Sequence, residues 1–307
     1  MILLIQLSNR VGCQLFVNGD TALNHLFNLW IIIMISTALV CFLVGELTHN
    51  YSQVDKVWSL MPIVYSWVTF SAYHLSSRIL LMTLLVTFWG IRLSYNFYRK
   101  GGYNILPWKG EENYRWGVVR QNPLLRKRFS KTLFNLFFIS FYQHVVIFLF
   151  CTPLLFAAKY SEIRLTELDY LAAFFILLFI LIETIADNQQ YEFQMQKRHK
   201  TPRTRIYTDY LNNGFVSEGL WSFVRHPNYT SEQAIWLSFY FFGVAASGQF
   251  INWTFTGPVL LILLFIGSTE LTERISLLKY PEFENYKRSV SKFIPIDFKS
   301  LKQGKLL

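Results

Sequence analysis

The chain has 307 residues, of which 52% are hydrophobic and 16% are charged, and its formal net charge is +10. Soluble domains carry roughly 25% charged residues, so the composition excludes an ordinary soluble domain. The basic residues flank apolar segments without any nucleic-acid-binding motif, and the three cysteines fit no metal-site spacing, so we expect neither a nucleic-acid partner nor a metal.

The apolar residues gather in seven segments, each close to the roughly 20 residues that cross a bilayer core. In chain order, the predicted spans cover 26–45, 57–74, 79–97, 133–157, 168–186, 234–250 and 252–268. The second span contains Pro62 and is the weakest, and Pro153 leaves a break open in the fourth. Because backbone groups in lipid must be satisfied within their own segment, we expect an all-α membrane bundle of about seven helices, with six or eight as alternatives.

Basic residues concentrate in the loops 98–132 and 187–232 and in the tail after residue 274. With seven spans these three regions lie on one side, and the positive-inside rule places that side, with the C-terminus, in the cytoplasm. Residues 1–25 are then an extracytoplasmic segment and residues 26–307 a single multi-pass membrane domain in contact with lipid. We expect the endoplasmic reticulum in a eukaryotic source and the plasma membrane in a bacterial one.

A dense set of functional groups stands just before the sixth span. The set comprises Gly219, Leu220, Trp221, Arg225, His226, Pro227, Asn228, Tyr229 and Glu232. Pro227 disfavours helix at the residue before it, which predicts a loop that turns into a helix. Asn228 and Glu232 are four residues apart and share one helical face. Helix capping by Asn228 is the simpler alternative, but a cap requires neither Arg, His nor Glu.

Other polar residues lie at the same, cytoplasmic, ends of the predicted spans. They are Glu46, Asp55, Arg92, Tyr95, Glu183, Asp187, Gln190, Glu270, Glu273, Arg274 and Tyr286. Structural alternatives exist, such as an interhelix pair for Glu183 or an interfacial position for Arg92. Structural charges would divide between the two ends of the bundle, so the clustering favours a site. The chain has no Walker loop and no G-x-G-x-x-G turn, so any nucleotide must bind through side chains between helices.

Several runs resemble the membrane reductases of the steroid 5-alpha-reductase superfamily, and most of all the multi-pass branch grouped with the 5-alpha-reductase C-terminal domain. The runs are Val54–Trp58, Phe88–Leu93, Tyr114–Trp116, Ile185–Asp187 with Gln190 and Phe193, Gly219–Trp221, Arg225–Tyr229, and Tyr286 with Phe293–Pro295. They cover most of the chain from about residue 50. Similar R-H-P-N-Y runs occur in sterol C14 and C7 reductases, and in membrane methyltransferases that modify isoprenylated cysteine or phospholipid.

The resemblance implies a cofactor cleft that opens to the cytoplasm, with residues 168–298 as the cofactor-binding half. It implies an NADPH-dependent oxidoreductase acting on CH–CH groups, with a carbon–carbon double bond of an enone or of a polyprenyl- or steroid-like lipid as substrate. The cofactor-binding residues on this basis are Arg92, Asp187, Arg203, Arg205, Arg225, His226, Asn228, Tyr229, Glu232 and Tyr286. The catalytic residues are Tyr95, as the donor to the developing enolate oxygen, and Asp55, which assists it.

Two departures from the family pattern matter. Ser231 stands where the pattern has Gly, and Glu270, Glu273 and Arg274 stand where the best-known steroid reductases have Arg and His, so steroid specificity is not supported. The alternative function is an S-adenosylmethionine-dependent membrane methyltransferase of a lipid or isoprenylated substrate, and a non-catalytic scaffold is the third. The many cytoplasmic Arg and Lys residues favour NADPH, because S-adenosylmethionine has no phosphates.

Overall fold

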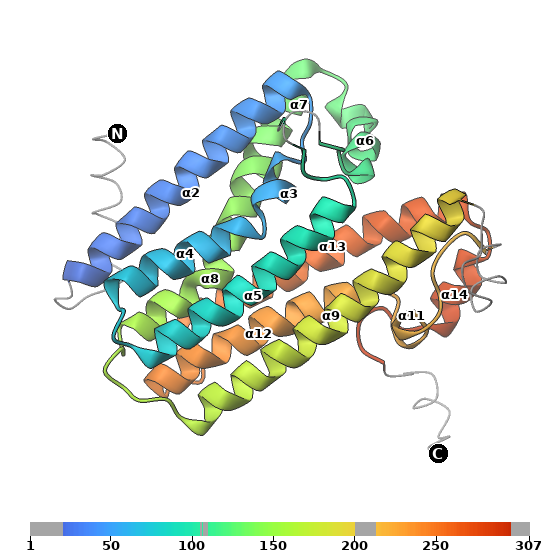
Figure 1. Cartoon of the computed structure of the whole chain (residues 1–307). Coiled ribbons are helices and arrows are strands. Elements are labelled where there is room, and N and C mark those ends of the chain that lie inside the picture. Colours follow the sequence, from blue (N-terminus) through green and yellow to red (C-terminus); the bar gives the residue numbers. More distant parts are fainter. Residues whose placement is uncertain (1–20, 105, 107–109, 200–212, 296–307) are drawn as a thin grey trace, which may run out of the picture. The chain divides into compact units, whose positions relative to one another are not determined.

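The computed structural model describes residues 21–104, 106, 110–199 and 213–295 (Figure 1). Over these ranges the chain is helical without any strand, apart from an isolated bridge between Val224 and Ser291. The predicted site residues Arg203 and Arg205 lie outside the described residues.

The helices of the described residues differ widely in length. Their bounds are α2 Thr21–Thr48, α3 Gln53–Val57, α4 Leu60–Ala72, α5 Ser77–Arg99, α6 Tyr114–Arg120, η2 Pro123–Leu125, α7 Arg128–Phe134, the π-helix η3 Asn135–Tyr142, α8 Gln143–Ala158, α9 Glu167–His199, α11 Leu220–Phe223, α12 Pro227–Ser247, η5 Trp253–Phe255, α13 Thr256–Lys279 and α14 Phe283–Ser289. Four of the predicted spans, 26–45, 79–97, 133–157 and 168–186, lie within α2, α5, the continuous run α7–η3–α8 and α9. The other three only overlap helices: 57–74 covers α4 and the end of α3, 234–250 extends beyond α12, and 252–268 covers η5 and the first half of α13.

Five stretches of helix are long and apolar enough to cross a membrane, as expected of an integral membrane protein. They are Thr21–Thr48, Ser77–Arg99, Arg128–Ala158, Glu167–Arg198 and Trp253–Lys279. Helix α4 has 13 residues. At 1.5 Å per residue it is about 20 Å long, which is short of the roughly 30 Å of a bilayer core. The count of seven crossings therefore stays a prediction.

The break left open at Pro153 does not occur, because α8 continues through this residue to Ala158. A proline lacks the N–H that would bond the carbonyl four residues earlier, here that of Leu149. The hydroxyl of Thr152 donates to this carbonyl at 2.6 Å and so replaces part of the missing hydrogen bonding. The residue before the proline thus compensates locally for the hydrogen bond that the proline cannot make.

The predicted loop 187–232 is wrong in its first part, because α9 runs on to His199. The polar residues after 186 end the apolar run but do not end the helix, since they are compatible with helical conformation. Asp187 and Gln190 lie on this helix, one turn apart, as expected for a face that continues from Glu183.

The chain divides into two compact units. The first comprises residues 1–174 and 236–261, and the second comprises residues 175–235 and 262–307. Within the first unit α4 packs on α5 and α8, and α2 packs on α8 (Figure 1). Its core includes the stacked rings of Trp30 and Tyr65, whose centroids are 4.4 Å apart. The second unit contains the segment 219–232 and is the one that carries the candidate site.

Candidate functional site

The segment before α12 is attached to α9 through Gly219 and Trp221. Gly219 has φ +58°, and a Cβ at this position would lie 2.2 Å from Nε2 of Gln189. The amide of Leu220 donates to Oε1 of Gln189 at 3.1 Å, and Nε1 of Trp221 donates to the carbonyl of Ala186 at 3.2 Å. Only glycine combines this backbone conformation with so close an approach, which explains the glycine before the tryptophan.

Helix α12 begins at Pro227, as the sequence predicted. Proline suits the first helical position because its missing N–H would have no intrahelical partner there. The amide Nδ2 of Asn228 donates to Oδ1 of Asp187 on α9 at 3.3 Å. Asp187 and Glu232 are both buried, and Glu232 is one turn beyond Asn228 on the same face of α12. The structure therefore brings Asp187 and Asn228 together.

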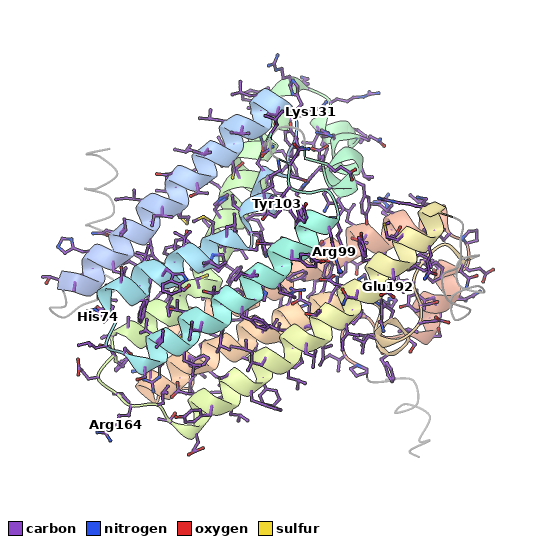
Figure 2. All side chains as sticks on the ribbon, in the orientation of Figure 1. His74, Arg99, Tyr103, Lys131, Arg164 and Glu192 are labelled. Atoms are coloured by element: carbon purple, nitrogen blue, oxygen red, sulfur yellow. The ribbon has the colours of Figure 1, made fainter. Side chains whose placement is uncertain are left out.

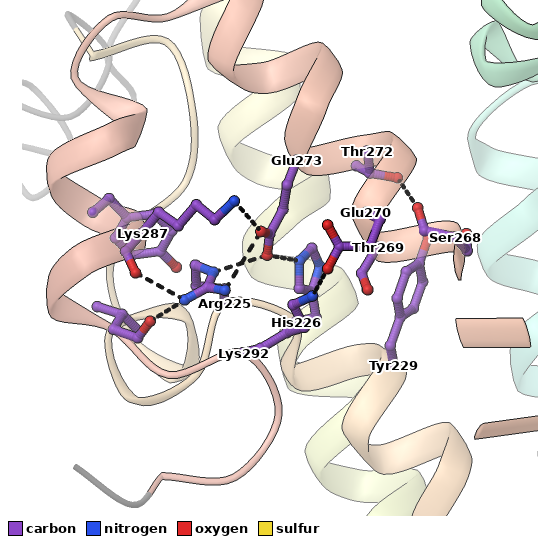
Figure 3. Close-up of polar contacts among 12 residues, drawn as sticks. Arg225, His226, Tyr229, Ser268, Thr269, Glu270, Thr272, Glu273, Lys287 and Lys292 are labelled. Atoms are coloured by element: carbon purple, nitrogen blue, oxygen red, sulfur yellow. Dashed lines mark hydrogen bonds and ion pairs between the residues drawn. The ribbon is translucent and has the colours of Figure 1, made fainter. Parts of the chain in front are cut away.

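Arg225 is engaged within the chain (Figure 3). Its Nε donates to Oε1 of Glu273 at 2.8 Å, and its Nη2 lies 3.4 Å from Oε2 of the same carboxylate. Its Nη1 donates to the backbone carbonyls of Lys287, at 3.1 Å, and Val290. A guanidinium has five N–H donors, so these contacts use four of them. Little capacity remains for the cofactor contact predicted for Arg225.

His226 shares Glu273 with Arg225. Its Nε2 lies 2.9 Å from Oε1 of Glu273, and because an ionised carboxylate only accepts hydrogen bonds, the imidazole donates. The His226 ring also stacks on Tyr229, with centroids 5.6 Å apart and planes 11° apart (Figure 3). Tyr229 also packs against Phe265, with ring centroids 4.7 Å apart. The imidazole thus joins Glu273 to the first turn of α12.

Tyr286 is also used inside the chain. Its hydroxyl donates to the carbonyl of Trp221, and burial raises the pKa of this phenol above its ordinary value. A buried tyrosine needs a partner for its hydroxyl, and Trp221 supplies one. Tyr286 therefore holds α14 against α11, whatever further role it has with a cofactor.

The remaining predicted residues, Asp55, Arg92 and Tyr95, belong to the first unit. The carboxylate of Asp55 accepts a hydrogen bond from Nε1 of Trp116 at 3.1 Å. Tyr95 is 62% exposed, and it shares its face of α5 with the exposed side chains of Phe88 and Ile91. Across the described part of the chain, no hydrogen bond joins the Tyr95 hydroxyl to Asp55.

Glu273 was not among the predicted site residues, although it is the group on which Arg225 and His226 converge. Its place among the polar residues at the end of the last predicted span was the available signal, but its partners lie 48 and 47 positions earlier in the sequence. Gln190 is one of the polar residues at the cytoplasmic ends of the predicted spans, but the sequence predicted no cofactor-binding or catalytic role for it. Its Oε1 is buried and has no hydrogen-bond partner among the residues that the structure describes. Over the residues that the structure describes, no group of three or more His, Cys, Asp and Glu side chains could hold a metal ion.

Comparison with known proteins yields a family and a relative. The model of a family described as "Protein of unknown function (DUF1295)" matches residues 41–290. The Schizosaccharomyces pombe (strain 972 / ATCC 24843) protein named "Uncharacterized protein C594.04c" is 37% identical over 276 residues, which cover 84% of this chain and 78% of that protein. No solved structure matches the chain. The family match includes the segment 219–232 and Glu273.

Proposed function

This chain belongs to the DUF1295 family, and we propose that it is a membrane oxidoreductase that reduces a carbon–carbon double bond with NADPH. The proposed substrate is an enone or a polyprenyl- or steroid-like lipid, in keeping with the five apolar helices. The observation that carries the proposal is the contact between Asn228 and Asp187, with Glu232 on the next turn of α12. These are the residues that the resemblance to steroid 5-alpha-reductases assigns to the nucleotide.

The polar atoms near this contact suit the donor groups of a nicotinamide nucleotide. The Oε1 of Gln190 has no hydrogen-bond partner in the described part of the chain, and Gln190 lies one turn after Asp187 on α9. A carboxamide N–H or a ribose hydroxyl would satisfy such an acceptor, and Asp187 and Glu232 accept from the same kinds of group. Asn228 can both donate and accept, which suits it to hold a carboxamide. We therefore assign the nicotinamide and ribose end to these four residues.

The reaction divides between the cofactor and the chain. Bound NADPH supplies the hydride. The chain must orient the double bond, exclude water and deliver a proton to the oxygen that gains charge. We propose Tyr95 for the proton, assisted by Asp55, because a phenol is a suitable general acid for an enolate.

Phosphate binding falls to residues other than Arg225, because its guanidinium is engaged with Glu273 and two carbonyls. We propose Arg203 and Arg205 for this role. The engagement of Arg225 also favours the second candidate, a methyltransferase that uses S-adenosylmethionine, because that cofactor has no phosphates to neutralise. The two candidates therefore have to be separated by experiment.

The test is the thermal unfolding of the detergent-purified protein with NADPH, NADH or S-adenosylmethionine. NADPH should raise the unfolding temperature, because a ligand that binds only the folded state stabilises it. Asn228→Ala should weaken NADPH binding by roughly tenfold or more, as expected for the loss of a partly buried polar contact.

Asn285→Ala is the matched control, because Asn285 is exposed and its amide donates to the carboxylate of Glu282, which is not part of the proposed cofactor site. It should bind NADPH as the unchanged protein does. Stabilisation by S-adenosylmethionine alone would reject the reductase in favour of the methyltransferase.

A further inference from the structure

We propose that Glu273 is a positioning residue, which holds the C-terminal segment 286–293 against residues 221–230 and so sets the first turn of α12. We call this set of contacts the clasp. It comprises Trp221, Arg225, His226, Thr230, Glu273, Tyr286, Lys287 and 290–293. The role of the clasp in preparing a cofactor site rests on the proposed function. The existence of the clasp contacts does not depend on that function.

Glu273 is the only carboxylate that the described residues bring to Arg225, His226 and Lys287 together (Figure 3). Its side chain is 1% exposed, and Nζ of Lys287 lies 3.5 Å from its Oε2. One buried anion therefore faces three groups that carry or can carry positive charge. Buried charges are tolerated only when they are paired and hydrogen-bonded, so loss of this carboxylate would leave Arg225 without its charge partner.

Backbone contacts continue the clasp along the chain. The amide of Arg225 donates to the carbonyl of Ser291 at 2.8 Å, and the amide of His226 donates to that of Lys292 at 3.3 Å. The hydroxyl of Thr230 donates to the carbonyl of Phe293 at 3.0 Å. The C-terminal segment is thus bonded to consecutive residues up to the first turn of α12.

These contacts act on the residues proposed to bind the cofactor. The carbonyl of His226 accepts from the amide of Thr230 at 2.9 Å, which is the hydrogen bond that closes the first turn of α12. Asn228 lies inside this turn, and Tyr229 stacks on the His226 ring. A shift of His226 would therefore move Asn228 relative to Asp187, and a shift of about 1 Å is enough to weaken a well-oriented site.

Glu270 provides a matched comparison on the same helix. It is one turn before Glu273, its side chain is 61% exposed, and its partner is Lys292. Exposed pairs of this kind contribute little, because water screens them. Glu270→Gln therefore removes the same charge from the same helix without touching Arg225 or His226. Glu270 pairs with the side chain of Lys292, whereas the clasp uses the carbonyl of that residue.

The experiment compares the full-length protein with Glu273→Gln and Glu270→Gln by hydrogen–deuterium exchange and by NADPH binding. Glu273→Gln should raise the exchange of peptides that cover 221–230 and 286–293 by roughly tenfold or more, because their amides lose protection when the clasp opens. Peptides from α2 and α5 should exchange as before. The NADPH affinity of Glu273→Gln should fall at a temperature where the protein is still folded. Glu270→Gln should change neither the exchange nor the NADPH affinity.

If Glu273→Gln does not fold, Tyr286→Phe takes its place. It removes only the hydrogen bond to the carbonyl of Trp221, and we expect the same two readouts to move in the same direction but by less. Unchanged exchange in either folded variant would overturn the clasp. Raised exchange with unchanged NADPH affinity would overturn its positioning role. If the parent protein binds no NADPH, the proposed function is rejected instead. The hydrogen–deuterium exchange data alone would then show whether the clasp exists.

Discussion

Arg78 and Asp169 form a buried ion pair at the beginnings of α5 and α9, within the first unit. Nε of Arg78 lies 2.7 Å from Oδ1 of Asp169, and the two side chains are 1% and 0% exposed. The guanidinium also donates to the carbonyls of Ile163 and Arg164, at 3.0 and 2.8 Å. Asp169 accepts in turn from the amide of Thr166 at 2.7 Å. The pair therefore organises the loop between α8 and α9.

We predict that Arg78→Met destabilises the protein by about 3–5 kcal/mol, because it leaves the Asp169 carboxylate buried without its cation. The free energy of unfolding in detergent measures the effect. Arg164→Met is the control, since the Arg164 side chain is exposed and only its carbonyl takes part. That substitution should stay within about 0.5 kcal/mol of the parent. Equal losses of unfolding free energy in both variants would contradict the role assigned to the Arg78–Asp169 ion pair.

At the scale of helices, α8 and α13 approach each other closely where Pro153 has altered the backbone hydrogen bonding. A Cβ on Gly257 of α13 would lie 2.3 Å from the carbonyl oxygen of Leu149 and 2.5 Å from Cα of Phe150. This carbonyl is the one that Thr152 caps. Small residues allow membrane helices to approach at this distance, so Gly257 sets the spacing of the two helices.

We predict that Gly257→Ala lowers stability by roughly 1–3 kcal/mol or more, because the backbone atoms it meets cannot move aside as a side chain can. Gly267→Ala on the same helix is the control, since a Cβ there would meet nothing within 4 Å. It should be neutral or stabilising by up to about 1 kcal/mol, as alanine is the better helix former. The unfolding temperatures of both variants in detergent provide the comparison, and a harmless Gly257→Ala would show that α8 and α13 are not in close contact.

At the scale of the whole molecule, charge is distributed unevenly along the chain. The first unit carries Arg99 and Lys131 at one end and His74 and Arg164 at the other (Figure 2). The run Arg128–Ala158, one of the apolar stretches, separates the basic region before it from the loop after Ala158. If this run crosses the membrane, the two regions face opposite sides, and the positive-inside rule places the basic one in the cytoplasm.

We predict that cysteines introduced as Arg126→Cys and Glu162→Cys are reached from opposite sides of the membrane. A Cys13→Ser background is suitable, because Cys41 and Cys151 are buried. A membrane-impermeant maleimide should label Glu162→Cys in sealed cells or vesicles of known orientation, and Arg126→Cys only from the cytoplasmic face. Labelling of both cysteines from one side would contradict the crossing, and reversed labelling would contradict the orientation.

Local properties of the sequence determined which segments are helical. Each predicted apolar stretch overlaps a helix, because hydrophobic length and the need to satisfy backbone groups act within one segment. Pro227 indicated the beginning of α12 through another local property, since a proline constrains its own backbone and that of its neighbour. The end of α9 was missed because polar residues end an apolar run without ending a helix, and only a breaker or tertiary contacts decide where the helix stops.

Only the tertiary structure decided what the polar side chains do. Arg225 and His226 were assigned to a cofactor, yet their hydrogen bonds go to Glu273 and the C-terminal segment. The contact of Asp187 with Asn228 joins residues 41 positions apart. The sequence predicted that these groups lie near a membrane boundary, and groups of this kind are costly to bury, so that each needs a partner. It could not name the partners, because pairing across helices depends on their packing and rotation, which no single segment encodes.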